Sequence, residues 1–434
     1  MPRGARFGRD FRLYFAGQVV SQIGTSFTQF ALPLLVFRLT GSPTNLALTT
    51  AATFIPYLLF GLVLGAVVDQ VDRRRMMLSV DLARAALIAV LPVLSITGHL
   101  EVWHIYVVAF GQSTLGILFE CGEFAAVPSL VPADDLVTAN GWIMATNSAG
   151  QVLGPVLAAG LLAVVPVADL LLVDSATFLL SALALLAIRR SFNDVEPPSE
   201  DPGAQPSSRI RRTLRDVRAG LRYVVGHPVL RTISLMMALI NFVGASAGTQ
   251  LVLFAKDELG ATDTQVGALY AAGSAGVVVV GLVAGPIRRR LSFAVTALGA
   301  LMLSGVVTAV FGVVDWYPAS LLLWAAASGL GLLLNINTGA LRQAIVPPHL
   351  FGRVISSAAV LAWSAIPLGA IAGARLIEVT GDVAAVYVAI GMATTAIALA
   401  FAFSPIRDGD RYLEEARLAK EARAAAREPA GATD

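Results

Sequence analysis

The chain has 434 residues, of which 56% are hydrophobic and only 14% are charged. Soluble globular proteins carry about a quarter of charged residues, so this composition leaves too little polar surface for a set of soluble domains. The net charge of +2 excludes nothing by itself, because the placement of the charges matters more than their sum. The single cysteine, Cys121, excludes an internal disulfide.

Apolar stretches of ~20 residues, the length that crosses a ~30 Å hydrocarbon core, recur from end to end and predict a polytopic membrane protein. Twelve helices are expected, at 12–38, 43–68, 75–97, 103–130, 138–165, 168–189, 230–255, 262–287, 291–314, 317–345, 354–379 and 382–405. Because the first long apolar stretch is a full-length span, we expect no cleaved signal peptide. The predicted fold class is an all-α membrane protein with twelve transmembrane helices.

Arginine is concentrated in alternate connections between these helices. The arginine-rich set comprises 3–12, 73–75, 189–231, 288–290, 342–353 and the tail from 407, whereas the opposite set holds little positive charge. Because Lys and Arg accumulate on the cytoplasmic side of a membrane protein, both termini are expected in the cytoplasm.

The longest polar stretch divides the chain into an N-terminal six-helix bundle (1–189), a cytoplasmic linker (190–228), a C-terminal six-helix bundle (229–405) and a charged cytoplasmic tail (406–434). The first part of the linker, DVEPPSEDPGAQPSS, is typical of disorder. The second part places arginines opposite an apolar face and is typical of an amphipathic helix on anionic headgroups, with Leu214, Val217, Leu221 and Val224 on that face.

The two bundles have the sequence features of a duplicated unit. Arg73–Arg75 recurs 215 residues later as Arg288–Arg290. Glycines one turn apart fall on the second and fifth helices of each bundle, at Gly61/Gly65, Gly150/Gly154, Gly281/Gly285 and Gly369/Gly373. Since such pairs let helices approach closely in lipid, these four helices are expected to form the contact between the halves.

Two signatures carry a family resemblance. The connection after the second helix matches G-x-x-x-D-[RK]-x-G-x-[RK]-[RK] at Gly65, Asp69, Arg74 and Arg75, with departures at Gln70 and Asp72. The fifth helix matches G-x-x-x-G-P-x-x-G-G at Gly150, Gly154 and Pro155, with departures at Ala158 and Ala159. Over about 10–405 the sequence resembles the major facilitator superfamily, in its branch of twelve-helix drug and siderophore exporters of the macrolide-efflux and enterobactin-exporter type.

The resemblance implies two pseudo-symmetric six-helix bundles that rock about a central cavity. It implies a monomer that exports amphipathic small molecules, drug, macrolide or siderophore-like, across the bacterial inner membrane in exchange for protons. It also implies a cytoplasmic gate that stabilises the outward-facing state, with candidate residues Asp69, Arg73, Arg74, Arg75, Asp81 and Arg84. The alternative for the arginines is that they act only as topology anchors.

Acids within the predicted spans are the candidates for proton coupling, because a charge in hydrocarbon is costly and invites a functional explanation. Glu120 and Glu123 share a face of the fourth helix, and no basic residue lies within one helical turn of either. Asp174 in the sixth helix is a weaker candidate. The structural alternative is that one glutamate pairs with Arg342 across the halves or faces cytoplasmic water.

Two further charge pairs are expected to be structural. Asp81 and Arg84 lie three residues apart on one face of the third helix and could neutralise each other, with gating as the second interpretation. Arg375 and Glu378 have the same spacing on the eleventh helix and are expected to form an ion pair.

Polar and aromatic residues on the presumed cavity helices are the candidate substrate contacts: Gln29, Phe30, Phe124, Asn147, Gln151, Asn241, Phe242, Asn335 and Trp363. Walls of this mixed kind suit amphipathic organic molecules. For any single aromatic residue, packing or contact with lipid is the more frequent role.

An enzyme is not expected, since the sequence has no phosphate-binding loop, HExxH motif or nucleophile elbow. Without a phosphate loop, transport must be secondary, and no cofactor, metal or nucleic acid is expected. The alternatives are a lipid or lysophospholipid flippase, an uncoupled facilitator of the same fold, or a membrane protein that does not transport.

Overall fold

The computed structural model describes residues 7–68, 71–132, 135–162, 164–193, 215, 218, 220–346, 351–415 and 418. Every regular element in these ranges is a helix. The first six long helices are α1 (Arg9–Thr40), α2 (Pro43–Val68), α3 (Arg73–Ile96), α4 (Val102–Leu130), α5 (Leu136–Leu161) and α6 (Leu170–Ala187).

The remaining helices are α8 (Pro228–Thr249), α9 (Leu251–Asp257), α10 (Asp263–Arg290), η2 (Val295–Gly299), α11 (Ala300–Val313), α12 (Tyr317–Ile345), α13 (Phe351–Trp363), α14 (Ala365–Thr380), α15 (Val383–Phe401) and η4 (Pro405–Asp408). The expected seventh, ninth and eleventh spans are each built from two consecutive segments. Ten described spans are long and apolar enough to cross a membrane. Together with α2 and α5, which have 26 residues each, these make up the twelve predicted membrane-spanning helices.

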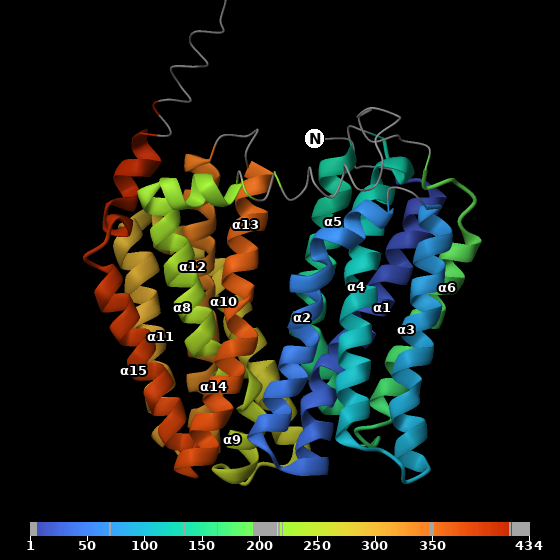
Figure 1. The fold of residues 1–434 in the computed structure, drawn as a ribbon, viewed down its shortest axis with the longest axis horizontal. Helices are drawn as coiled ribbons and strands as arrows, with labels where there is room; N and C mark the ends of the chain where they lie inside the picture. The colour runs from blue at the N-terminus through green and yellow to red at the C-terminus, as the bar shows by residue number, and fades with distance from the viewer. Residues whose placement is uncertain are drawn as a thin grey trace, which may run out of the picture.

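Two six-helix bundles stand side by side (Figure 1). In one, α1 and α3 pack on α6 and α2 packs on α4; in the other, α10 packs on α12, α11 on α15 and α8 on α14. The duplication is visible in α4 and α12, which both have 29 residues and begin 215 residues apart. The predicted fold class is confirmed.

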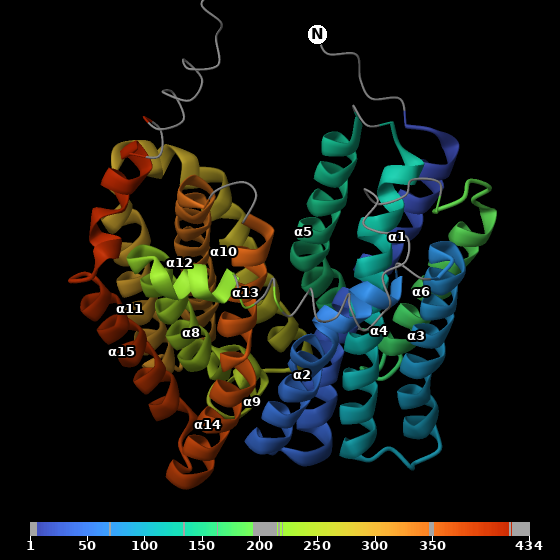
Figure 2. The same cartoon turned by 45° about the horizontal axis from the view of Figure 1, so that its top comes forward.

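The bundles meet at one end and diverge toward the other, in both views (Figures 1 and 2). The helix pairs α2–α14 and α5–α10 form most of the contact. We name the end where the bundles meet the closed end and the end where α1 begins and α15 finishes the open end. The described hydrogen bonds between the halves all lie in the closed-end half of the helices: Arg38–Asp263, Thr44–Glu378, Gln250–Pro43, Thr50–Thr249 and Ser274–Gln151.

An ion pair links the halves at the closed end. Arg38 of α1 contacts one oxygen of Asp263, the first residue of α10, and Lys256 contacts the other at 2.6 Å. Asp263 belongs to the first turn of α10, where a carboxylate is favoured by the helix dipole. The expected pair of Arg375 and Glu378 is also present here, at 2.8 Å.

The helices that join the halves were predicted, but the glycines on them have another role. Gly150 and Gly154 of α5 face α1 of the same half, where a Cβ would press on Gln22 and overlap Ser26. The Ser26 hydroxyl donates to the carbonyl oxygen of Gly150 at 2.9 Å. These glycines therefore bring α5 against α1 and not against the other half.

The second half repeats this arrangement. Gly369 and Gly373 of α14 face α8, where a Cβ would overlap the Phe242 backbone and the Ser246 side chain. A Cβ added at Gly61 or Gly285 would meet nothing within 4 Å, and one at Gly281 would meet only Leu332 of the same half. The surroundings of Gly65 are not described. The four helices expected to form the inter-half contact do form it, but not through their described glycines, because spacing identifies a close-packing face but not its neighbour. Between α2 and α14 the contact is made by buried Ala47, Ala370 and Ala374.

The linker helix is described only in part. Residues 220–226 are helical, and Val224 is buried against Leu230, Val346 and Val354 of the C-terminal half. Leu214 and Val217, expected on the same apolar face, lie outside the described residues. Exposed arginines accompany the helix at 215, 218 and 222.

Candidate functional site

A polar cavity of about 520 Å³ lies within the N-terminal half, and we name it the N-half chamber. All six helices of that half contribute to its wall. Most of its polar groups are uncharged and come from α1, α2, α4 and α5: Gln18, Ser21, Gln22, Thr25, Gln29, Thr49, Thr50, Thr53, Gln112, Ser113, Thr146, Asn147 and Gln151. Such a wall offers many hydrogen-bonding groups inside a hydrocarbon-embedded bundle.

The three predicted proton-coupling acids all reach this chamber. Glu120 is exposed to it and makes no hydrogen bond or ion pair with any described residue. Glu123 accepts a hydrogen bond of 2.7 Å from the hydroxyl of Tyr14. Asp174 is 1% exposed and accepts hydrogen bonds from the hydroxyls of Thr28 and Thr177.

Arg84 of α3 is the cation of the chamber. Its Nε donates to Gln112 at 3.1 Å, and its guanidinium lies 4.1 Å from the centre of the Phe178 ring. Arg84 interacts electrostatically with Asp174, Asp81 and Glu120. One fixed positive charge is thus shared among several carboxyl groups.

The ion pair expected between Asp81 and Arg84 is not formed. Arg84 instead donates to Gln112 of α4 and lies over the Phe178 ring of α6, and Asp81 is fully buried with no hydrogen-bond donor on either carboxylate oxygen. The hydroxyl of Ser181 is nearby without a hydrogen bond of normal geometry to Asp81. Spacing along α3 placed the two residues on one face but could not reveal the competing partner on α4.

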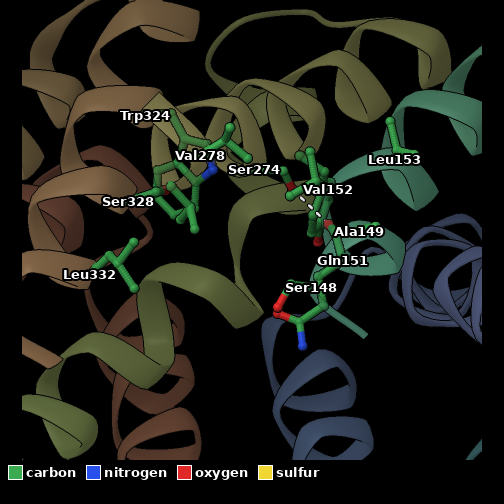
Figure 3. A pocket seen from close by; sticks show the side chains of 13 residues that line it. Ser148, Ala149, Gln151, Val152, Leu153, Ser274, Val278, Trp324, Ser328 and Leu332 are labelled. Carbon is green, nitrogen blue, oxygen red and sulfur yellow. Dashed lines mark hydrogen bonds between the residues drawn. The ribbon is translucent and has the colours of Figure 1, made fainter. Parts of the chain in front are cut away.

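Pro155 of α5 has a specific consequence for the contact between the halves. A proline has no N–H to donate to the carbonyl four residues earlier, which is that of Gln151. This carbonyl oxygen accepts a hydrogen bond of 2.9 Å from Ser274 of α10 instead (Figure 3). The exporter motif therefore frees a backbone acceptor that the opposite half uses.

Two further cavities adjoin the chamber. One, of about 720 Å³, lies between α5, α10 and α12 and is lined by Gln151, Tyr270 and Trp324 among others (Figure 3). The other, of about 460 Å³, lies at the junction of the halves and is lined by Gln29, Asn241 and Tyr270. Gln151, Gln29 and Tyr270 each line two of the three cavities, so the cavities are neighbours.

A family model described as transmembrane secretion effector matches residues 7–425. The chain belongs to this family of major facilitator transporters. This assignment confirms the predicted superfamily and the prediction of a transporter rather than an enzyme.

Curated relatives cover most of the transporter. The chain is 24% identical over 375 residues to macrolide efflux protein A of Streptococcus pyogenes, and the match covers 86% of this chain and 90% of that protein. It is 26% identical over 364 residues to enterobactin exporter EntS of Escherichia coli O6:K15:H31 (strain 536 / UPEC), across 79% of each. Both relatives belong to the exporter types that the sequence motifs indicated.

A solved structure with the same fold is a bacterial homologue of the human lysosomal transporter Spinster, in an inward-facing and unoccupied conformation. The TM-score is 0.66 at 12% identity, across 94% of this chain and 96% of that one. This likeness shows the shared architecture of two six-helix bundles.

The arginines of the expected gate are held within the N-terminal half of the transporter. Arg73 is 5% exposed and donates to the carbonyl oxygens of Ala125 and Phe192. Arg74 donates to the last carbonyls of α6, at Leu185 and Leu186. Favourable cation–carbonyl contacts of this kind are typical of helix C-termini.

Arg75 is largely exposed, and the sequence departure beside it has a local role. The carboxylate of Asp72 accepts from the Arg75 backbone N–H at 2.8 Å and so caps the first turn of α3. The remaining gate candidate, Asp69, lies outside the described residues.

The expected substrate contacts fall into three groups. Gln29, Asn147 and Gln151 line the N-half chamber, and Asn241 lines the junction cavity while donating to the Ala362 carbonyl. Phe30 is buried in the core against Tyr270 and lines none of the three cavities described above. The others are partly or strongly exposed outside the three cavities: Phe124, Phe242, Asn335 and Trp363.

Sequence reasoning missed Tyr57, Tyr270 and Trp324. Tyr57 lines the chamber and packs edge-on against Trp363 of the other half, with ring centres 5.7 Å apart. Tyr270 and Trp324 line the cavity between α5, α10 and α12. The available signal was an aromatic residue with a polar group in the middle of an apolar helix, since such groups usually find a partner when buried.

Proposed function

We propose that this transporter exports amphipathic small organic molecules from the cytoplasm and that an inward flow of protons drives the export. Substrate enters from the open end, where α1 begins and α15 finishes, and this end faces the cytoplasm. The two halves then rock so that the closed end opens. Glu120, Glu123 and Asp174 bind the proton in one stage of this cycle and release it in another.

The observation that carries the proposal is the acidic N-half chamber. Isolated carboxylates surrounded by hydrocarbon are costly, and they are kept where they bind protons, ions or substrate. Three carboxyl groups line one cavity beside a single guanidinium that already bonds to Gln112. Protonation of such a group neutralises it without any other rearrangement, which suits exchange of a proton for a substrate.

The walls of the three cavities support an amphipathic substrate. They combine amide and hydroxyl groups with apolar and aromatic side chains, as in pockets that bind small organic molecules. The relatives named above, a macrolide efflux protein and an enterobactin exporter, support the same class and the same direction. The cytoplasmic position of the open end is supported by the arginines near it, at 73–75 and 288–290.

Uptake into inverted membrane vesicles tests this function. A fluorescent amphiphile that quenches on accumulation is followed with and without an imposed pH gradient. We expect gradient-dependent accumulation by the unchanged protein and none by the double variant Glu120→Gln, Glu123→Gln at equal membrane expression. Asp315→Asn, which alters an exposed carboxylate in the connection between α11 and α12, serves as the control and retains accumulation.

Accumulation that ignores the pH gradient would instead favour an uncoupled facilitator. Full activity of the double variant would rule out the glutamates as coupling groups. Labelling of the 73–75 and 288–290 connections from opposite faces of the membrane would remove the basis of the proposal, because the halves would then not be equivalent bundles.

A further inference from the structure

We propose that the linker helix binds anionic phospholipids of the cytoplasmic leaflet and thereby anchors the C-terminal half to the membrane surface. This helix is described at residues 215, 218 and 220–226. The sequence indicated an amphipathic helix, and the structure adds where each of its faces lies. The inference goes beyond the proposed function and shares with it only the orientation of the open end toward the cytoplasm.

The linker helix has three distinct faces. Successive residues of an α-helix are rotated by about 100°, so residues three or four apart share a face. Val224 is 1% exposed and packs on the protein, whereas Leu221 and Val225 are 37% and 51% exposed. The next face around the helix consists of exposed arginines, at 215, 218 and 222. An exposed apolar stripe therefore runs between the buried face and the row of arginines.

The buried face attaches the linker helix to the open end of the C-terminal half. Val224 packs with Leu230 of α8, with Val346 at the end of α12 and with Val354 of α13. In both views the yellow-green helix that precedes α8 lies crosswise to α8 (Figures 1 and 2). Because α8 crosses the bilayer, a helix that lies crosswise at its end runs along the membrane surface.

The arginines of the linker helix have no counter-charge within the described chain. None of the described ion pairs or side-chain hydrogen bonds involves Arg215, Arg218 or Arg222. The arginine at the matching edge of the same half differs, since Arg288 pairs with Asp410. A row of unpaired cations on one face of a surface helix attracts an anionic partner.

An anionic bilayer surface suits both exposed faces of the helix at once. An interfacial helix places its apolar residues at the boundary of headgroups and acyl chains and its arginines among the headgroups. Anionic headgroups of the cytoplasmic leaflet attract arginines in this position. A soluble anion would neutralise the arginines but leave Leu221 and Val225 in water, so an anionic phospholipid is the partner that fits.

Lipid bound at this helix acts on three spans of the C-terminal half. Through Val224 the helix contacts the open-end parts of α8, α12 and α13. Headgroups that bind the arginines therefore also hold these ends at the level of the membrane surface. The linker helix gives the C-terminal half a fixed point on the cytoplasmic leaflet while the N-terminal half moves relative to it.

Contact quenching in lipid nanodiscs tests this inference on the full-length transporter. A fluorophore is attached at Val225→Cys in a Cys121→Ala background, and the discs contain phosphatidylglycerol and phosphatidylcholine in equal amounts. Bromine, which quenches on contact, is placed on the acyl chains of one lipid or of the other, so the bilayer has the same headgroups in both preparations. We expect brominated phosphatidylglycerol to quench at least about threefold more strongly than brominated phosphatidylcholine.

Two matched pairs of arginines locate the site. The double variant Arg218→Gln, Arg222→Gln should bring the ratio of the two quenching constants to about one. The double variant Arg189→Gln, Arg190→Gln removes the same charge from exposed positions of the N-terminal half and should leave the ratio unchanged. High salt should lower the ratio in the unchanged arginine background, because exposed charges are screened. Leu221→Asn should weaken quenching by both lipids about twofold or more while the preference remains.

Equal quenching by the two lipids, or a preference that survives Arg218→Gln, Arg222→Gln, would overturn the inference. Absence of quenching by either lipid would also overturn it, because the helix would then stand away from the bilayer. A preference that appeared only after Asp194, Glu196, Glu200 and Asp201 were replaced by their amides would assign the arginines to the acids of the linker instead. None of these outcomes concerns the acidic N-half chamber, so the proposed function is decided separately by vesicle uptake.

Discussion

The two halves of this transporter pack alike but differ in chemistry. In the N-terminal half, ionisable residues occupy the interior of the helices, at Asp81, Arg84, Glu120, Glu123 and Asp174. The residues 215 positions later than the first four are Thr296, Gly299, Asn335 and Thr338, none of them charged. The described charges of the C-terminal half instead lie near helix ends. A duplicated fold has thus kept its packing while one copy alone holds the charged chamber.

The largest expected effects come from mutations in the close helix contacts that the two halves share. Gly154→Val and Gly373→Val place side chains against Ser26 and Ser246, at matching positions of the two halves. Overpacking of a tight contact costs about 1–3 kcal/mol, so we expect each variant to lower the melting temperature of the purified protein by several degrees.

The two losses should be similar in size if the halves are packed equivalently. Gly285→Val is the control, because nothing lies within reach of a Cβ there, and it should leave the melting temperature nearly unchanged. A large loss from one glycine of the pair and none from the other would contradict the structural equivalence of the halves.

Removing the ion pair that links the two halves should have a smaller effect than overpacking the glycine contacts. Asp263→Asn removes the carboxylate that joins Arg38 of one half to Lys256 of the other. Because this contact is partly exposed, we expect only about a twofold to fivefold fall in the population of molecules whose two halves are separated at the open end. Spin labels at Met144→Cys on α5 and Leu361→Cys on α13, in a Cys121→Ala background, report the separation by electron–electron double resonance.

Asp315→Asn serves as the control for this measurement and should leave the distance distribution unchanged. A distribution unaltered by Asp263→Asn would mean that the ion pair does not stabilise the closed end. The alanine contact of Ala47 with Ala370 and Ala374 would then account for the closure.

Much of the fold could be predicted from the sequence, because each span must be apolar over a bilayer's thickness. The helix expected at 317–345 has those bounds in the structure, and the one expected at 103–130 begins one residue earlier. The break of the eleventh span at Ser364 was not predicted, since Trp363, Ser364 and Ala365 are unremarkable within an apolar run.

The candidate site was predictable only along single helices. Glu120 and Glu123 stand out because acids are rare in hydrocarbon, and both reach the chamber. That Arg84 bonds to Gln112 and that Tyr57 meets Trp363 depends on neighbours from other helices, which spacing along one helix cannot identify. The glycine pairs show the same limit, because their close-packing face was readable while the helix it faces was not.

The most direct test of the account is to follow protons during transport. Transporter in proteoliposomes that contain a pH-sensitive dye is given substrate on the side of the open end. We expect proton movement from the unchanged protein and from Arg342→Gln, which alters a partly buried guanidinium of the C-terminal half. We expect none from the triple variant Glu120→Gln, Glu123→Gln, Asp174→Asn. Proton movement that survived in the triple variant, or that vanished in Arg342→Gln alone, would contradict the claim that the N-terminal half carries the coupling.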